Sequence, residues 1–305
     1  IVASVKGTLK EVELNDDTIH AFAEGDDRSI LMAASRNLGS STNPVWHSFQ
    51  TGELEELVGT GAAASYDNEH LDLTITTNPL GPALIADCDD ASRALESLHK
   101  FIREDPQRPV AIDLEGLLGG SRPHIALVQV AVPYSDDWDR IACYVFHVHK
   151  NPRILRDTGP ESLRALLESG NPKSMHCCRG DCSSLHLEYG IRVRNVFDTA
   201  VGDSLIMGKQ HNTQRGLGDV VHDYLGVHMS HKGSFKHTPG MFEAWPLPKL
   251  YMEYAQEDVT FSCKLYQVQR DALTRIGLLE LARAVSSQRE APQVHWETSK
   301  QKNPW

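Results

Sequence analysis

Two carboxylates stand one residue apart at the end of an apolar run, in the segment VAIDLEGLLGG. If this segment is a strand, Asp113 and Glu115 point to the same face, because successive strand side chains alternate. Two like charges placed side by side cost free energy unless solvent or a cation lies between them. The pair is therefore a candidate for binding a divalent metal, with plain solvation as the alternative.

Further acidic side chains stand in two later segments. Asp181 opens the helix expected after SMHCCRG, and Asp258 lies four residues after Tyr254 in YAQEDV. Since residues four apart share one face of a helix, Tyr254 and Asp258 are expected to project together. Carboxylates from three separate elements can surround two divalent ions about 3.5–4 Å apart, which clamp the attacking and leaving oxygens of a phosphodiester. Oxygen ligands favour Mg²⁺ or Mn²⁺, and the tyrosine hydroxyl would hold or help activate the attacking water.

The elements that must position these side chains follow from hydrophobic periodicity. Strands are expected over residues 109–116, 124–133, 142–149, 174–178 and 195–199. Helices are expected over residues 89–105, 161–170, 181–190, 199–209, 217–226 and 247–273. Strands followed by interleaved helices predict an α/β fold with a mixed sheet flanked by helices.

Three regions are expected along the chain. Residues 1–80 contain short alternating segments separated by loops, which predicts a small β-rich domain. Residues 81–285 carry the α/β pattern and all of the paired carboxylates. Residues 286–305 are polar and are expected to form a disordered tail.

Composition limits the classes of function. The net charge of −11 argues against a surface coated with basic residues for bulk nucleic-acid binding, although a local basic channel remains compatible with it. The chain has six cysteines, and no signal-peptide pattern precedes them. A reduced, intracellular protein is therefore expected, in the nucleus, cytoplasm or mitochondrion. The cluster Cys177, Cys178 and Cys182 is interpreted as small core residues rather than a zinc site. No apolar run reaches the ~20 residues of a membrane span.

Taken together and in order, these segments resemble the three motifs of the DEDDy class of 3′→5′ exonucleases, which includes ribonuclease D. The first motif is matched by IDLEG, the second by HCCRGDCSSLHLEYGI with NVFDT, and the third by YAQEDV. The second motif is most similar to the Egalitarian-like branch, whose members are associated with RNA biology. The resemblance covers roughly residues 83 to 280 and implies a ribonuclease-H-like fold.

The resemblance also implies the roles of single residues. Asp113, Glu115, Asp181 and Asp258 would be the metal ligands, and Tyr254 would position the water. The expected activity is that of a metal-dependent 3′–5′ exoribonuclease, which releases nucleoside 5′-monophosphates from the 3′ end of single-stranded RNA. Some members of this branch carry an Sm-like domain ahead of the nuclease, and VKGTLKEVEL followed by TIHAF is similar to its opening strands.

Two alternative functions stay open at this point. One is a catalytically inactive scaffold that binds RNA or proteins and forms a homodimer, which the net charge and the extra β-rich region motivate. The other is a 3′–5′ exonuclease that acts on DNA, because the groups that would read the 2′-hydroxyl cannot be identified from sequence. Protein partners are expected under the leading hypothesis as well.

Several other side chains are candidates for weaker roles. Asp198 is interpreted as a helix N-cap rather than a fifth ligand, and Glu257 as a solvated neighbour of Asp258. His176 is expected to be a buried histidine satisfied by backbone, with contact to phosphate as the alternative. The candidates for substrate binding are Leu114, His176, Arg179, Lys209, Arg215 and Lys232.

Overall fold

The computed structural model describes most of the chain beyond residue 82 and three short strands before it. The described ranges are 10–11, 19–23, 31–34, 83–135, 140–207, 214–229, 231, 238 and 240–290. The three early strands form an antiparallel sheet in the order β1 (Lys10–Glu11), β2 (Ile19–Ala23) and β3 (Leu31–Ala34). They lie in the region predicted to be β-rich, and the division of the chain at residue 80 and the Sm-like architecture stay predictions.

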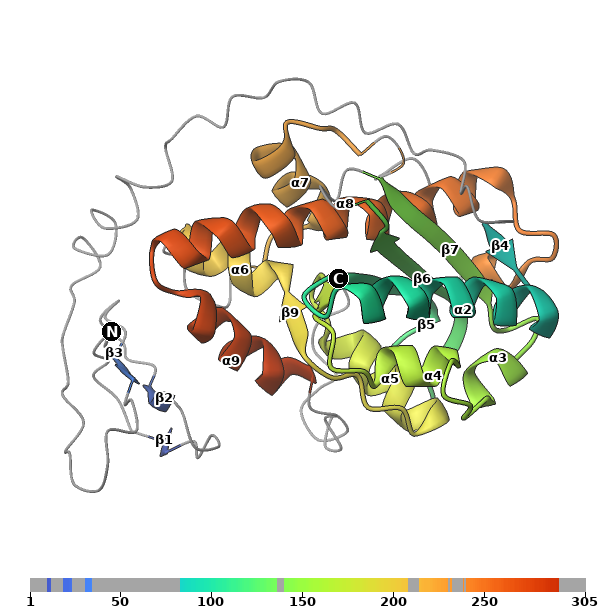
Figure 1. Ribbon diagram of the computed structural model, residues 1–305, viewed down its shortest axis with the longest axis horizontal. Helices are drawn as coiled ribbons and strands as arrows, with labels where there is room; N and C mark the ends of the chain where they lie inside the picture. The colour runs from blue at the N-terminus through green and yellow to red at the C-terminus, as the bar shows by residue number, and fades with distance from the viewer. Residues whose placement is uncertain are drawn as a thin grey trace.

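The remaining strands build one mixed sheet of six strands in the order β4-β7-β6-β5-β8-β9 (Figure 1). Strand β4 pairs in parallel with β7, β5 with β8, and β8 with β9. The central strand β6 pairs antiparallel with both β5 and β7. The strands are β4 (Leu84–Ile85), β5 (Val110–Leu117), β6 (His124–Pro133), β7 (Ile141–His147), β8 (Lys173–Met175) and β9 (Val196–Asp198). This arrangement confirms the predicted α/β fold class.

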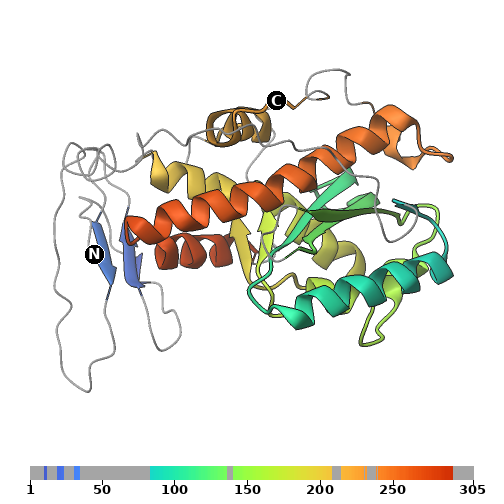
Figure 2. The same ribbon diagram turned by 45° about the horizontal axis from the view of Figure 1, so that its top comes forward.

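Helices cover both faces of the sheet. Figure 2 shows the sheet between the long helix α8 on one side and α2 on the other. Among the helices that the structure describes, none combines the length and the apolar character that a membrane crossing needs. The helices are α2 (Cys88–Glu104), α3 (Arg153–Arg156), α4 (Leu163–Leu167), α5 (Arg179–Tyr189), α6 (Thr199–Ile206), α7 (Leu217–Leu225), the 3₁₀ helix η1 (Met241–Glu243), α8 (Lys249–Arg275) and α9 (Leu279–Glu290).

Strand β5 divides its side chains between the two faces of the sheet. One set enters the main hydrophobic core together with residues of α2 and α5: Val110, Ile112 and Leu114. The intervening Ala111 packs instead with Val259 of α8. Because side chains alternate along a strand, Asp113 and Glu115 share the face of Ala111 and project towards α8.

The carboxylate of Asp198 joins four parts of the fold. It is fully buried and caps α6 by accepting a hydrogen bond from the N–H of Ala200 at 3.0 Å, which confirms the predicted N-cap. It also accepts from the N–H groups of Cys177 at 2.9 Å and Cys178 at 3.3 Å, in the turn that leads into α5. Its fourth partner is Arg289 of α9, whose Nη1 lies 2.9 Å from Oδ2.

Helix α9 corrects the predicted start of the C-terminal tail. Residues 286–290 belong to this helix, and Ser286 is fully buried. The reason is that polar side chains of α9 satisfy the outer edge of β9. The hydroxyl of Ser286 accepts from the N–H of Asp198 at 2.9 Å, and the carboxylate of Glu290 accepts from the N–H of Val196 at 2.9 Å. These polar residues therefore close a sheet edge that would otherwise be open for pairing.

We expect the substitution Arg289→Met to lower the free energy of unfolding by about 3–5 kcal/mol, because it leaves the buried Asp198 carboxylate without its cation. The matched control is Arg283→Met on the same helix, whose ion pair with Glu280 is exposed and contributes about 0–1 kcal/mol. Urea unfolding of the two variants measures the difference. An equal decrease in the free energy of unfolding in both variants would show that the buried ion pair contributes no more stability than the exposed one.

Candidate active site

A β-bulge between Glu115 and Gly116 ends the regular part of β5. Gly116 has a φ of 146°, and a Cβ there would lie 2.2 Å from the carbonyl oxygen of His124. Any larger residue would therefore collide with the backbone of β6, so the sequence needs glycine at this point. The bulge follows directly after the two strand carboxylates, at the point where pairing with β6 becomes irregular.

Helix α8 brings the third carboxylate to those of Asp113 and Glu115. Side-chain oxygens of Asp113, Glu115 and Asp258 all lie within 4.8 Å of one another. Glu115 is 8% and Asp258 4% exposed. The hydroxyl of Ser174 on β8 donates to the carbonyl of Ser262 at 2.8 Å, which fastens α8 to the sheet one turn after Asp258. Three carboxylates thus meet at a largely buried point.

Asp181 reaches the same strand from the first turn of α5. Strand β8 pairs with β5 only as far as Ala111 and Ser174, so the edge of β5 beyond that point is open. The N–H of Leu114, between the two strand carboxylates, donates a hydrogen bond to the Asp181 carboxylate. Burial raises the pKa of Asp181 to about 7, and the negative charge of Asp198 also raises it. A cation beside Asp181 would oppose both effects.

Tyr254 lies one helical turn before Asp258 and is 7% exposed. Its ring packs with Phe242 of η1, with ring centroids 6.1 Å apart, and with apolar residues of β6 and β7. The predicted sharing of one helix face by Tyr254 and Asp258 follows from their spacing on a continuous helix.

The donor set of this cluster fits a hard divalent cation. Converging carboxylates with low exposure repel one another, and positive charge between them removes that cost. Oxygen ligands are those that Mg²⁺ and Mn²⁺ prefer. Asp113, Glu115 and Asp258 are thus residues that could hold a divalent metal ion, with Asp181 bound to the same strand.

Two of the predicted substrate-binding residues have protein partners instead. The ring nitrogens of His176 lie 2.8 Å from the hydroxyl of Thr199 and 2.9 Å from the carbonyl of Arg215. The guanidinium of Arg215 donates to Asp203 at 2.7 and 3.0 Å and also pairs with Asp223. These contacts give both residues structural roles, which for His176 agrees with the leading interpretation rather than with contact to phosphate.

The other four candidates are placed as follows. The side chain of Leu114 is buried in the hydrophobic core and is not available to a substrate. Arg179 is exposed at the first residue of α5, close in sequence to Asp181. Lys209 and Lys232 lie outside the residues that the structure describes.

Glu257 is a correction to the sequence analysis. It is 6% exposed rather than solvated, and its carboxylate accepts a hydrogen bond from the N–H of His231 at 3.2 Å. The prediction was wrong because α8 is covered on a second side. Helix α7 and the residues after it pack against the helix there, so that face is not open to solvent.

Gln129 is a site residue that the sequence analysis missed. It lies directly opposite Asp113 on β6, on the same face of the sheet, and is fully buried. Neither its amide oxygen nor its nitrogen finds a hydrogen-bond partner among the described residues. The available signal was a single polar residue inside the apolar run HIALVQVAVP. A buried amide left without partners costs about 1–3 kcal/mol, so a polar partner such as water is expected beside it.

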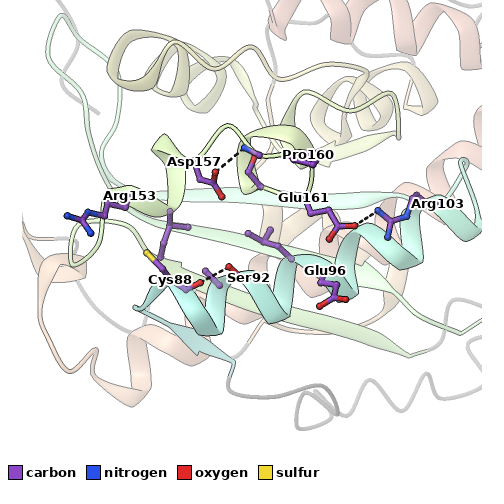
Figure 3. A pocket seen from close by; sticks show the side chains of 13 residues that line it. Cys88, Ser92, Glu96, Arg103, Arg153, Asp157, Pro160 and Glu161 are labelled. Atoms are coloured by element: carbon purple, nitrogen blue, oxygen red, sulfur yellow. Dashed lines mark hydrogen bonds and ion pairs between the residues drawn. The ribbon is translucent and has the colours of Figure 1, made fainter.

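A groove of about 500 Å³ lies elsewhere, between α2 and the segment that contains α3 (Figure 3). Its wall includes an ion pair between Arg103 and Glu161 at 2.7 Å, together with Cys88 and Asp157. None of the candidate carboxylates lines this groove. The candidate active site is therefore defined by its carboxylates and not by the size of a cavity.

Comparison with known proteins gives three kinds of match. A family model for a 3′–5′ exonuclease matches residues 82–273. The "piRNA biogenesis protein EXD1" of Bombyx mori is 33% identical over 70 residues, which are 21% of this chain and only 22% of that protein.

Two solved structures share the fold. RNase D of Escherichia coli has a TM-score of 0.54 and 19% identity, over 69% of this chain and 50% of that one. The Trypanosoma brucei RNase D complex with RNA U12 has a TM-score of 0.52 and 18% identity, over 72% of this chain and 74% of that one.

We expect Asp258→Asn to be at least as stable as the unmodified protein in chelator, because the change removes one of three converging charges. Mg²⁺ at about 100 times its dissociation constant should stabilise the unmodified protein by about 2.7 kcal/mol and the variant by much less. Thermal unfolding with and without Mg²⁺ measures both effects. Asp271→Asn, an exposed carboxylate on the same helix, is the matched control and should respond like the unmodified protein. An unchanged Mg²⁺ response in Asp258→Asn would contradict this assignment.

Proposed function

Because the chain belongs to the 3′–5′ exonuclease family, we propose that it is a metal-dependent exoribonuclease acting on the 3′ end of single-stranded RNA. Its products would be nucleoside 5′-monophosphates. The observation that carries the proposal is the convergence of Asp113, Glu115 and Asp258 within 4.8 Å. A metal-dependent nuclease needs converging carboxylates to hold its metal ions. A protein that only binds RNA does not need them, and their mutual repulsion would only destabilise it.

Each site residue has a defined task in this proposal. Asp113, Glu115, Asp181 and Asp258 would hold two Mg²⁺ or Mn²⁺ ions, which when bound stabilise the negative charge that develops on the phosphate. The hydroxyl of Tyr254 would orient the attacking water by a hydrogen bond.

The surrounding protein keeps these groups in place. Packing against Phe242 and the sheet restricts the ring of Tyr254, so its hydroxyl needs little reorganisation during the reaction. The amide of Gln129, buried opposite Asp113, would hydrogen-bond a water held beside that carboxylate. Low exposure of the carboxylates also strengthens every electrostatic interaction within the site.

Two of the similar proteins support RNA rather than DNA as the substrate. The name of the Bombyx mori protein refers to piRNA biogenesis, and the Trypanosoma brucei enzyme is described in complex with RNA U12. Single-stranded RNA gives a protein access to the 2′-hydroxyl, which is the group that separates it from DNA of the same sequence.

The proposal predicts a metal-dependent ladder of products. A 5′-labelled single-stranded RNA incubated with Mn²⁺ should shorten one nucleotide at a time from its 3′ end, and chelator should stop the reaction. Asp113→Asn should reduce the rate by about 10³-fold, since each 1.36 kcal/mol of lost transition-state stabilisation is tenfold. Tyr254→Phe should reduce it by about 10²-fold, because it removes the hydroxyl that positions the water.

Asp271→Asn is again the matched control and should retain the full rate, because this carboxylate is exposed on α8. DNA of the same sequence, tested in parallel, should be degraded much more slowly. Faster degradation of the DNA would identify a DNA exonuclease instead. Intact RNA with Mn²⁺ as well as with chelator, in protein that still binds the RNA, would identify a scaffold.

A further inference from the structure

A second group of metal-ligand side chains lies at the turn end of the β5–β6 hairpin, where Leu117 pairs with His124. His124 begins β6, His149 follows β7, and Glu243 ends η1. Their ligand atoms all lie within 4.8 Å of one another. His124 Nε2 is 2.8 Å from His149 Nδ1 and 3.9 Å from a carboxylate oxygen of Glu243. We propose that these three residues bind a Zn²⁺ ion, at a site separate from the carboxylate cluster.

The fold brings the three side chains together through contacts of its own. The N–H of His149 donates to the carbonyl of Ala126 at 3.1 Å, which fixes the segment after β7 beside the start of β6. Met241 and Phe242 of η1 are buried in a cluster that includes Ala126, and they hold Glu243 at the same place. The group is therefore built from three separate segments, each held by backbone pairing or apolar packing.

A further carboxylate orients His124. Nδ1 of His124 lies 3.5 Å from one oxygen of Glu188 on α5, and the other oxygen accepts from the N–H of Ile125 at 2.8 Å. Histidines that bind metal through one nitrogen usually direct the other N–H at a carboxylate, which fixes the tautomer and makes the ligand nitrogen more basic. Glu188 gives His124 this arrangement, with Nε2 directed at His149 and Glu243. It acts as a positioning residue.

The ligand types select the metal. Two imidazole nitrogens and one carboxylate oxygen form a set that suits Zn²⁺, with water in the fourth position, and they suit Mg²⁺ poorly. Tetrahedral Zn–N bonds of about 2.0–2.1 Å place two ligand nitrogens about 3.3 Å apart. The observed 2.8 Å must widen by a few tenths of an ångström, which the exposed His149 side chain can accommodate. When Zn²⁺ binds, Nδ1 of His149 becomes a ligand atom. The proton that lies between this nitrogen and Nε2 of His124 is lost from Nδ1, and His149 carries its proton on Nε2 instead.

The neighbouring His147 does not belong to the set. Its Nε2 contacts the carbonyl of Ala244 at 3.0 Å, and its Nδ1 accepts from the N–H of Lys150 at 3.3 Å. Both of its ring nitrogens are thus engaged with backbone. A bound Zn²⁺ would fasten η1 to β6, and η1 is the segment that leads into α8 with the catalytic candidates Tyr254 and Asp258.

Zinc binding can be tested without any nuclease assay. Equilibrium dialysis of the full chain carrying Asp113→Asn, in excess Mg²⁺, keeps the carboxylate cluster from dominating the result. This parent should bind one equivalent of Zn²⁺, and adding His149→Gln should abolish that equivalent or weaken it at least 100-fold. Glu188→Gln should weaken binding by about 10- to 100-fold, as loss of a carboxylate behind a ligating histidine does. Co²⁺ in place of Zn²⁺ should give the visible absorption of tetrahedral coordination, lost in His149→Gln.

The matched control is His222→Gln, which removes a histidine whose ring stacks on His228 at 4.0 Å, away from the group. This variant should bind Zn²⁺ like its parent. Circular dichroism confirms that each variant is folded, and His149 is exposed enough for its substitution to be tolerated. Equal Zn²⁺ affinity in the parent and in folded His149→Gln would overturn the proposal. So would an equal loss in His222→Gln, which would indicate nonspecific binding by surface imidazoles.

Discussion

A single buried ion pair, between Asp198 and Arg289, joins the turn before α5, the start of α6 and helix α9. The carboxylate accepts hydrogen bonds from the turn at Cys177 and Cys178, so it determines where α5 begins and hence where Asp181 meets β5. It also caps α6 and anchors α9 against the outer strand of the sheet. The arrangement carries a cost, because the negative charge of Asp198 also raises the pKa of Asp181.

Repulsion between negative charges also affects the cluster of Asp113, Glu115 and Asp258. Carboxylates that must meet in order to hold cations repel one another until the cations arrive, so their convergence opposes folding of the metal-free chain. Other contacts offset this cost. Ala111 and Val259 pack β5 against α8, and the hydroxyl of Ser174 binds the backbone of Ser262. The stability of the sheet and helices thus holds in place a site that is unfavourable by itself, as is common for functional sites.

The spacing of residues within one strand or one helix correctly predicted which side chains share a face. Strand alternation put Asp113 and Glu115 on one face, and helix spacing did the same for Tyr254 with Asp258. What it could not predict depends on contacts between distant segments. Glu257 was expected in solvent because nothing in its own helix reveals the cover provided by α7.

Long-range contacts also account for the other differences. The polar start of the expected tail is ordered because its side chains bind the backbone of β9, about 90 residues earlier in the chain. The group of His124, His149 and Glu243 has no local spacing at all, since its members come from three segments. Gln129 is the exception, because one polar residue within an apolar strand was a visible signal.

The long sequence separation between Asp198 and Arg289 has a consequence for synthesis of the protein. Arg289 follows Asp198 by 91 residues, which a ribosome adds in about 5–20 s. During that interval the carboxylate is present without its cation, and the turn that places Asp181 lacks its anchor. We therefore expect the nascent chain to assemble its candidate active site only after α9 has left the exit tunnel. Nascent chains stalled before Arg289 should stay sensitive to protease near this turn, and early protection there would contradict the expectation. The candidate active site would thus form late in folding, once the segment that carries Arg289 is free to pack.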